Sequence, residues 1–224
     1  MKKIFFVVNN IKEFNFENLI IKYLPKVDVK IGKSLPKNTK EYDLIILWSF
    51  QKIIKKLPKD KNVILFHSTD LPKGKGWAPI YHTLIKKKKY FTISGIVANE
   101  KVDAGNIIVK ARFKIQDNHT AEYLRKLDHE ISIMLIDKIL KKMKEPIKGK
   151  KQISKGDTYP RRYEKDNQID IKLPFKQMIN HIRACEESHP AFFYLNKTKY
   201  VIKVKPENKP NFPKKLEIKF YDWA

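Results

Sequence analysis

Two polar loops hold the side chains of this sequence that are best suited to chemistry. Residues 67–76 begin with His67 and follow a continuous apolar run, and residues 99–105 place Asp103 just before an Ala-Gly pair. A carboxylate from a neighbouring loop orients an imidazole and stabilises its protonated form. The two residues could therefore form a proton-transferring pair, whereas the alternative is a structural histidine and an ordinary turn aspartate.

The elements that must position these loops are predicted from apolar patterning. Short apolar runs predict strands, and apolar residues three to four positions apart predict helices. The patterns predict strands at 4–8, 27–31, 43–48, 63–66, 90–97 and 106–113, and helices at 14–24, 79–85 and 120–143. Strands that alternate with helices form a mostly parallel sheet, and ligands bind at the carboxyl ends of its strands. We therefore expect an α/β domain over residues 1–150, with the two loops as its first candidate sites.

Residues 151–224 form a second, smaller unit in this prediction. The chain becomes rich in Lys, Gly and Pro from about residue 146, and then shows a helical pattern at 175–186 and short strand patterns at 192–195, 200–205 and 216–221. Asn-Lys and Pro-rich turns separate those strands. We expect a small α+β annex at the C-terminal end, and its strands are where a homodimer contact would form.

Lysine dominates the charge of the chain. The 224 residues include 48 Lys and Arg against 24 Asp and Glu, a formal net charge of +24, yet only five of the basic residues are arginines. Proteins that read nucleic-acid grooves depend on the bidentate arginine fork, and the lysines here are spread almost evenly. This pattern favours a general lysine bias over a nucleic-acid surface, and the same positive field suits a phosphorylated small substrate.

The remaining composition excludes several classes of protein. Cys185 is the single cysteine, which excludes a disulfide framework, and the six histidines lack metal-ligand spacing, so no metal site is predicted. The apolar run at 4–8 fits a first strand better than a leader, and no run approaches the about 18 apolar residues of a membrane helix. We expect a cytoplasmic protein without a membrane partner.

A resemblance to a known family rests on two blocks. Residues 64–85, ILFHSTDLPKGKGWAPIYHTLI, and residues 102–108, VDAGNII, resemble in order and spacing the formyltransferase family that uses 10-formyltetrahydrofolate as donor. Residues 158–195 are similar to a segment of formyltransferases that act on tRNA or amino sugars, with Arg161-Arg162 and Ile182-Arg183 in the same order. The resemblance covers most of residues 43–195 and implies a Rossmann-like formyltransferase domain.

The resemblance implies roles for the two loops. His67 would stabilise an oxyanion and shuttle a proton, and Asp103 would hold His67 and help to deprotonate the attacking amine. One position departs from the family, because the family asparagine two residues before the histidine is Leu65 here. The hydrolase domain of formyltetrahydrofolate dehydrogenase also carries an aliphatic residue there, so hydrolysis of formyl-folate stays open. The candidates to supply the missing hydrogen bond are Ser68, Thr69 and Asn99.

Binding residues follow from the resemblance and from proximity to the loops. The candidates that would enclose 10-formyltetrahydrofolate, by analogy with the family, are Phe50, Ile53, Val97, Ala98, Asn99 and Glu100. Residues that border the loops or follow a strand are the candidates to meet the acceptor, namely Asn9, Asn10, Lys73, Lys75, Trp77, Arg161 and Arg162. The alternatives are core packing for the apolar side chains, a solvated loop for the lysines and surface ion pairs for the arginines.

Several functions fit these features. The first hypothesis is an N-formyltransferase that acts on a nucleotide-linked amino sugar, with formyl-folate and that sugar as its partners. The alternatives are a methionyl-tRNA or glycinamide ribonucleotide formyltransferase, a 10-formyltetrahydrofolate hydrolase, and a non-enzymatic basic protein that binds nucleic acid. In the family, tRNA enzymes carry a substantial C-terminal barrel and purine-pathway members lack the arginine-bearing annex, which favours the amino sugar.

Overall fold

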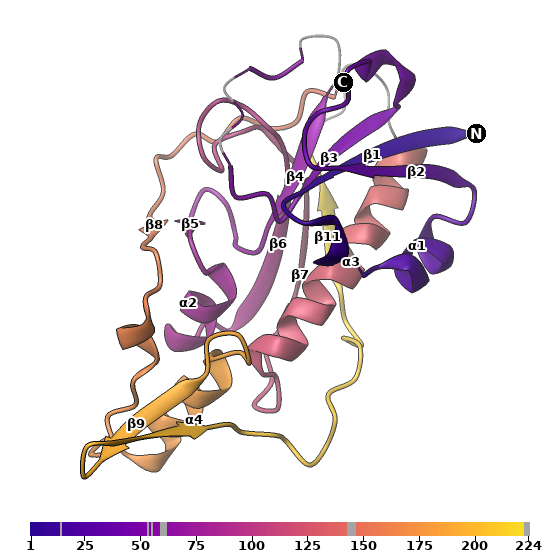
Figure 1. Ribbon diagram of the computed structural model, residues 1–224. Helices are drawn as coiled ribbons and strands as arrows, with labels where there is room; N and C mark the ends of the chain where they lie inside the picture. Colours follow the sequence, from indigo (N-terminus) through magenta and orange to yellow (C-terminus); the bar gives the residue numbers. More distant parts are fainter. Residues whose placement is uncertain (14, 53, 55, 59–61, 143–146, 222–224) are drawn as a thin grey trace.

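A seven-stranded sheet organises the chain (Figure 1). The computed structural model describes all residues except 14, 53, 55, 59–61, 143–146 and 222–224. Within the described residues the strand order is β11-β7-β6-β4-β3-β1-β2. Their bounds are Lys2–Val8 for β1, Val27–Gly32 for β2, Leu44–Trp48 for β3, Val63–His67 for β4, Tyr90–Val97 for β6, Ile107–Lys114 for β7 and Glu217–Phe220 for β11.

The strand directions confirm a mostly parallel sheet. Strands β2, β1, β3 and β4 run in parallel, β6 is antiparallel to β4, β7 is antiparallel to β6, and β11 is antiparallel to β7. Five of these seven strands therefore point the same way. The antiparallel half brings the loop that follows β6 back beside the start of β4, where Val97 pairs with Ile64.

The central strands are apolar on both faces, as buried parallel strands must be. All five residues of β3 are buried, and its side chains alternate between two apolar clusters. The larger cluster lies under α3 (Ala121–Lys142), whose buried residues recur three to four positions apart, including Leu124, Leu127 and Ile131. Thr120 precedes this helix and caps it, because Thr120 Oγ1 accepts a hydrogen bond of 3.3 Å from the Tyr123 amide.

The smaller elements complete the layers and the annex. Helix α1 (Glu17–Tyr23) packs beside α3, and α2 (Pro79–Ile85) packs against α4 (Phe175–Ala184) of the annex. Strands β9 (Ala191–Leu195) and β10 (Thr198–Ile202) form a hairpin, which lies with α4 at the end of the molecule away from the two termini (Figure 1). Short 3₁₀ helices span Ile11–Glu13, Thr39–Glu41 and Glu164–Asn167.

The last strand differs from the sequence-based expectation. The strand pattern at 216–221 predicts a strand of the annex, but β11 pairs with β7 of the main sheet, with Glu217 opposite Arg112 and Phe220 opposite Val109. On the side away from β6, β7 pairs with β11. This pairing satisfies backbone N–H and C=O groups of β7 that the annex hairpin does not reach. A division of the chain at residue 150 stays a prediction.

A second link joins the annex to the main domain. Strand β5 (Lys75–Gly76) pairs in parallel with β8 (Thr158–Tyr159), and an isolated bridge connects Ile107 with Lys150. Two-residue strands carry no periodicity, so the sequence patterns could not indicate them. The segment around residues 150–160 therefore lies against the loops of the main domain.

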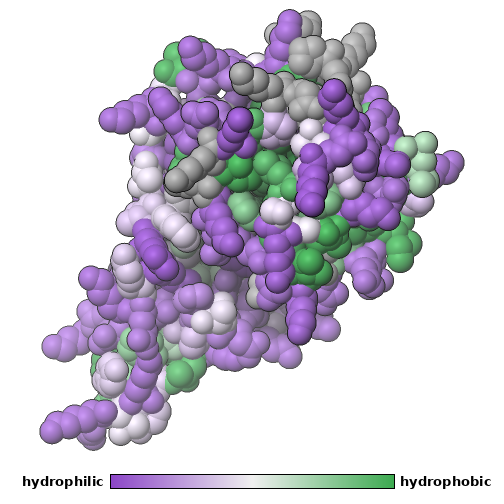
Figure 2. Space-filling view, turned by 45° about the horizontal axis from the view of Figure 1, so that its top comes forward, coloured by the Kyte–Doolittle hydropathy of each residue, from purple (hydrophilic) through white to green (hydrophobic). Residues whose placement is uncertain are grey.

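Hydrophilic side chains cover most of the outline of the face shown in Figure 2, around a hydrophobic area near its middle. Of the helices in the described part of the chain, none is both long and apolar enough to cross a membrane. The same described residues contain no group of three side chains placed to hold a metal ion.

One buried histidine predicts how stability depends on pH. His119 is 2% exposed, and burial, followed by the charge of Arg183, lowers its pKa to about 4. The unfolded chain binds a proton at this residue below about pH 6.5, whereas the folded chain stays neutral until about pH 4. His119 therefore does not reduce the free energy of unfolding above pH 6.5. That free energy falls as the pH decreases from 6.5 towards 4, because only the unfolded chain binds the proton.

Unfolding in urea at about pH 7.5 and about pH 5.5 measures this effect. The His119→Gln variant is expected to lose about 1 kcal/mol less unfolding free energy than the wild type between these two pH values. An equal loss in both proteins would show that His119 does not cause the pH dependence.

Candidate active site

His67 ends β4 and is buried at the carboxyl edge of the parallel strands. Its Nε2 lies 2.8 Å from the carbonyl oxygen of Gly74. Because a carbonyl only accepts, Nε2 carries a hydrogen and donates it. In the neutral ring the other nitrogen, Nδ1, is therefore the one that can accept a proton, and it faces Asp103.

Asp103 reaches this histidine from the loop between β6 and β7. Its Oδ2 lies 3.5 Å from His67 Nδ1 and accepts a hydrogen bond of 2.9 Å from the Gly76 amide. The two side chains are only 9% and 12% exposed. The structure thus brings together the two residues that sequence analysis singled out, in a site largely shielded from water.

Close backbone contacts fix the loop that carries Asp103. The residue has a left-handed φ of 48°, and Gln152 Nε2 donates to the carbonyl oxygens of Asp103 and Gly105 at 2.9 and 2.8 Å. A Cβ on Gly105 would lie 1.6 Å from the Val97 carbonyl oxygen. Only glycine fits there, so this residue sets how closely the loop folds back onto β6.

The loop that carries Gly74 and Gly76 is held by the segment before β8. The Gly74 amide donates to Asp157 Oδ1 at 2.7 Å, and the strand pairing of Gly76 with Tyr159 extends the contact. A Cβ on Gly156 would lie 1.8 Å from the Pro72 carbonyl oxygen. The sequence alone does not single out this Gly-Asp pair. A glycine next to an aspartate is common in turns, so this dipeptide does not indicate that its carboxylate binds a distant loop.

The three candidates for the missing hydrogen-bond donor have different surroundings. Ser68 Oγ donates to Asp128 Oδ1 at 2.9 Å, and Asn99 is exposed, with its Oδ1 accepting from the Lys101 amide. Thr69 is 5% exposed, and its Oγ1 is buried with no hydrogen-bond partner among the described residues. Of the two buried hydroxyls, that of Thr69 is therefore the one still available, whereas the amide donor of Asn99 lies on an exposed loop.

Candidate folate-binding residues lie on an apolar wall near the site. Leu65, Phe50 and Ala98 all pack on the smaller apolar cluster of the sheet. The amides of Val97 and Ala98 are engaged by the carbonyl oxygens of Asn106 and Val63. Glu100 is exposed beside Asn99, and Ile53 lies outside the described residues. The structure thus places an aliphatic surface where the family asparagine would stand.

The asparagines after β1 brace the neighbouring loops. Asn9 Nδ2 donates to the Ser49 carbonyl oxygen at 2.6 Å, and Asn9 Oδ1 accepts from the Gln51 amide at 3.2 Å. Asn10 Oδ1 accepts from the Lys12 amide at 3.1 Å. These contacts give both asparagines a structural role at the carboxyl edge of the sheet, and their contact with an acceptor stays a prediction.

The two adjacent arginines differ in their contacts. The Arg161 guanidinium lies 5.2 Å from the ring centroid of Trp77, which is 43% exposed in the same loop as Lys73 and Lys75. The Arg162 guanidinium lies 4.0 Å from the ring centroid of Tyr81. Its nitrogens donate to Asn167 Oδ1, Cys185 Sγ and the His189 carbonyl oxygen. Arg162 therefore joins parts of the annex, while Arg161 and Trp77 border the site loop.

The chain is similar to known proteins over most of its length. Residues 28–138 match a family model described as formyl transferase. The chain is 29% identical over 201 residues to a methionyl-tRNA formyltransferase of Fusobacterium nucleatum, across 87% of this chain and 64% of that protein. The chain thus spans less than two thirds of the length of this relative.

Two solved structures share the fold. A methionyl-tRNA formyltransferase from Clostridium thermocellum has a TM-score of 0.71 at 19% identity, covering 98% of this chain and 100% of the other. A sugar N-formyltransferase from Shewanella has a TM-score of 0.67 at 17% identity, covering 94% of this chain and 100% of the other. The likeness therefore extends over the annex as well as the main sheet.

Proposed function

Since this chain belongs to the formyl transferase family, we propose that it transfers a formyl group from 10-formyltetrahydrofolate to the amine of a nucleotide-linked amino sugar. The observation that carries this proposal is the contact between His67 and Asp103, which come from separate loops and share a buried site. An imidazole beside a carboxylate is suited to moving a proton from an attacking amine.

His67 handles the proton in this proposal. As the amine nitrogen bonds to the formyl carbon, His67 accepts the proton that the amine loses. The imidazole then returns a proton to the folate nitrogen as its bond to the formyl carbon breaks. Asp103 stabilises the imidazolium and is itself held by the Gly76 amide. The shielded site strengthens these interactions because water competes less for the charges.

The surroundings of the pair fit a folate. 10-Formyltetrahydrofolate supplies the formyl carbon, and its flat ring system requires an apolar surface. Phe50, Leu65 and Ala98 offer such a surface beside β4. The exposed loop residues Asn99 and Glu100 adjoin it and carry polar groups for the edge of the ring.

The available hydroxyl of Thr69 supports a role as the oxyanion donor in place of the family asparagine. Thr69→Val is expected to lower kcat by about 10²-fold, since loss of one oxyanion donor has effects of that order. The free energy of unfolding should change little, because the hydroxyl has no protein partner to lose. Steady-state kinetics and urea unfolding measure the two quantities.

The control for this variant is Thr83→Val, which replaces a buried threonine on α2. It lies outside the site loop and is expected to leave kcat unchanged. Wild-type kcat in Thr69→Val would place the oxyanion donor on another residue.

Trp77 and Arg161 support a nucleotide-linked acceptor. An exposed indole can stack on a base, and a guanidinium beside it can bind a phosphate. Lys73 and Lys75 of the same loop add positive charge. Methionyl-tRNA is the second candidate acceptor, and the identity to a methionyl-tRNA formyltransferase favours it.

A formylation assay tests these acceptors directly. The protein is incubated with 10-formyltetrahydrofolate and, in separate reactions, UDP-glucosamine, nucleotide-linked sugars with an amine at other ring positions, methionyl-tRNA, or no acceptor. Turnover with a nucleotide-linked amino sugar is the expected result. Turnover confined to methionyl-tRNA would favour the second candidate, and turnover without an acceptor would indicate a hydrolase. Tight, strongly salt-dependent binding to arbitrary duplex DNA without any turnover would favour a nucleic-acid binder.

The hairpin of the annex is the expected place of a homodimer contact. It exposes large apolar side chains at Tyr194, Leu195, Tyr200 and Val201. Exposed apolar patches of this kind are common in interfaces. Light scattering of the purified protein measures the oligomeric state.

We also propose a cytoplasmic location for the protein.

A further inference from the structure

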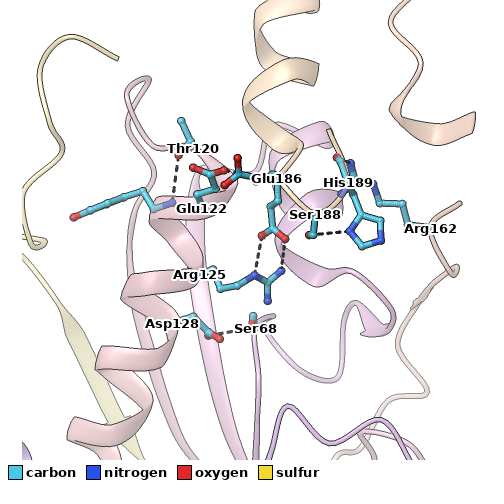
Figure 3. Close-up of polar contacts among 11 residues, drawn as sticks. Ser68, Thr120, Glu122, Arg125, Asp128, Arg162, Glu186, Ser188 and His189 are labelled. Carbon is cyan, nitrogen blue, oxygen red and sulfur yellow. Dashed lines mark hydrogen bonds and ion pairs between the residues drawn. The ribbon is translucent and has the colours of Figure 1, made fainter. Parts of the chain in front are cut away.

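The partners that orient His67 lie on one face of the sheet. Phe66 packs on the larger apolar cluster under α3, and Leu65 packs on the smaller cluster. Because successive side chains of a strand point to opposite faces, His67 lies on the face of Leu65, away from α3. Figure 3 shows that α3 reaches this strand end at Ser68 instead, through a hydrogen bond to Asp128. The groups that orient the imidazole are therefore those of the two site loops.

Two acceptors compete for the single ring hydrogen of the neutral imidazole. The Gly74 carbonyl oxygen lies 2.8 Å from His67 Nε2, and Asp103 Oδ2 lies 3.5 Å from Nδ1. A neutral histidine carries hydrogen on one ring nitrogen, and its hydrogen bonds decide which one. The shorter contact favours hydrogen on Nε2. A weaker contact with Gly74 would favour the other tautomer, in which Nδ1 donates to Asp103.

Residues 156–159, named here the strap, hold the peptide group that carries this carbonyl. The Lys75 amide belongs to the same peptide group as the Gly74 carbonyl, and it donates to the Asp157 carbonyl oxygen at 3.1 Å. The Gly74 amide donates to Asp157 Oδ1 at 2.7 Å and to the Asp157 carbonyl oxygen at 3.1 Å. Hydrogen bonds in a chain polarise and strengthen one another. The strap therefore fixes the position of the acceptor for His67 and also strengthens the bond to it.

The strap also supports the contact that holds Asp103. The Trp77 amide donates to the Tyr159 carbonyl oxygen at 3.2 Å, and Gly76 pairs with Tyr159 in the ladder of β5 and β8. The Gly76 amide donates to Asp103 Oδ2 at 2.9 Å. The buried ring of Tyr159 lies against Gly74, where a Cβ would come within 2.8 Å of the ring. Both members of the catalytic pair thus bond to a loop segment that the strap holds in place.

The carboxylate of Asp157 contributes to the strap as a hydrogen-bond acceptor rather than as a charge. Its Oδ2 lies 3.9 Å from Lys86 Nζ, just after α2, and both side chains are about half exposed. Exposed ion pairs of this kind contribute little to stability. The contact of Oδ1 with the Gly74 amide is the shorter one, at 2.7 Å.

We propose that the strap is a positioning element of this site, with Asp157 as its positioning residue, and that it keeps the neutral His67 in the tautomer with hydrogen on Nε2. Nδ1 is then the nitrogen that can take up a proton. The consequence for turnover rests on the proposed function, in which Nδ1 receives the proton of the amine. The tautomer is a property of the protein alone and can be measured without turnover.

¹⁵N NMR of the imidazole nitrogens in Asp157→Ala is the central experiment. It is recorded at about pH 9, well above the usual range of histidine pKa values. In the wild type we expect a protonated Nε2 and an unprotonated Nδ1 for His67, whose signals are identified by their loss in His67→Asn. In Asp157→Ala the two nitrogen signals are expected to move towards each other, because the weaker Gly74 contact lets both tautomers form.

Two further variants of the strap sharpen the test. Asp157→Asn keeps an oxygen that can accept from the Gly74 amide, and it is expected to restore the wild-type signals. Gly156→Ala would place a Cβ 1.8 Å from the Pro72 carbonyl oxygen, which forces the strap away from the loop. We expect it to mix the tautomers more strongly than Asp157→Ala does. If Gly156→Ala does not fold, the comparison of the two Asp157 variants decides the proposal.

Asp170→Ala is the matched control from the annex. Asp170 Oδ1 also accepts from a backbone amide, that of Lys172 at 2.9 Å, and its carbonyl oxygen accepts from the Leu173 amide. This variant is expected to leave the His67 signals unchanged. Wild-type signals in Asp157→Ala, or an equal change in Asp170→Ala, would overturn the proposal.

Steady-state kinetics provide a second measurement. Asp157→Ala is expected to lower kcat by about tenfold with little change in KM, because a misoriented base impairs the chemical step rather than binding. Asp157→Asn is expected to retain kcat, and an equal loss in both variants would contradict the positioning role. Absence of formyl transfer by the wild type would refute the proposed function, and the tautomer of His67 would still decide the role of the strap.

Discussion

Replacing His67 by asparagine is expected to lower kcat for formyl transfer by about 10³-fold or more. The imidazole is buried, with Nε2 on the Gly74 carbonyl oxygen and Nδ1 facing Asp103. An asparagine amide can still donate to Gly74, so the loop keeps one contact, but it cannot take up a proton near neutral pH. Single-turnover kinetics with 10-formyltetrahydrofolate and the acceptor measure the loss.

Asp103→Asn tests the other half of the pair. The amide oxygen can still accept from the Gly76 amide, and only the charge that faces His67 is removed. We expect kcat to fall by about 10²-fold or more, since a general base that loses its orienting carboxylate is impaired by this order. Circular dichroism should show a native fold in both variants.

His82→Asn is a matched control for the histidine variant. The His82 ring also contacts a backbone carbonyl oxygen, that of Pro160, at 3.1 Å, but it lies on α2 and forms no ion pair with a carboxylate of the described residues. Normal kcat is expected for this control. Wild-type turnover in both His67→Asn and Asp103→Asn would refute the assignment of the site.

Gly105→Ala is expected to abolish the site by displacing the loop that carries Asp103. The added Cβ would lie 1.6 Å from the Val97 carbonyl oxygen, a backbone atom that cannot move without disturbing β6. The loop must then separate from the strand, which breaks the contacts of Gln152 with the loop carbonyls. We expect the free energy of unfolding to fall by about 2–4 kcal/mol and kcat to fall with it.

Gly32→Ala provides the comparison. There the added Cβ would meet the tip of the Phe5 ring at 2.6 Å, and a side chain at that position can turn aside. This variant is expected to lose less than about 1 kcal/mol of unfolding free energy and to retain kcat. Equal effects of the two substitutions would argue against a special constraint at Gly105.

Local patterns predicted most of the sheet and its helices. The bounds of α2 and β6 agree with the apolar runs that predicted them, because both elements are ended by polar or turn-forming residues. The pairing of β11 with β7 could not be predicted in this way. A short strand fits either sheet by its pattern, and its partner is decided by which edge is open.

The candidate site was predictable only in part. The sequence indicated His67 and Asp103 because each stands in a polar loop beside a strand, and the structure places them 3.5 Å apart. It did not indicate Asp157, Gln152 or Asp128, which act through contacts between distant segments. Such residues have no motif, since their role depends on tertiary geometry rather than on spacing along the chain.

The pairing of β11 with β7 has a consequence for folding and solubility. It closes a loop of about a hundred residues, at an entropic cost of about 4 kcal/mol, so this ladder forms late. Until then β7 presents a row of unpaired backbone groups that another chain could join. The outward positions of β7 are Lys110, Arg112 and Lys114, whose like charges repel a second copy of the same strand. Part of the lysine excess of the chain therefore reduces self-association through β7 while the sheet is still incomplete.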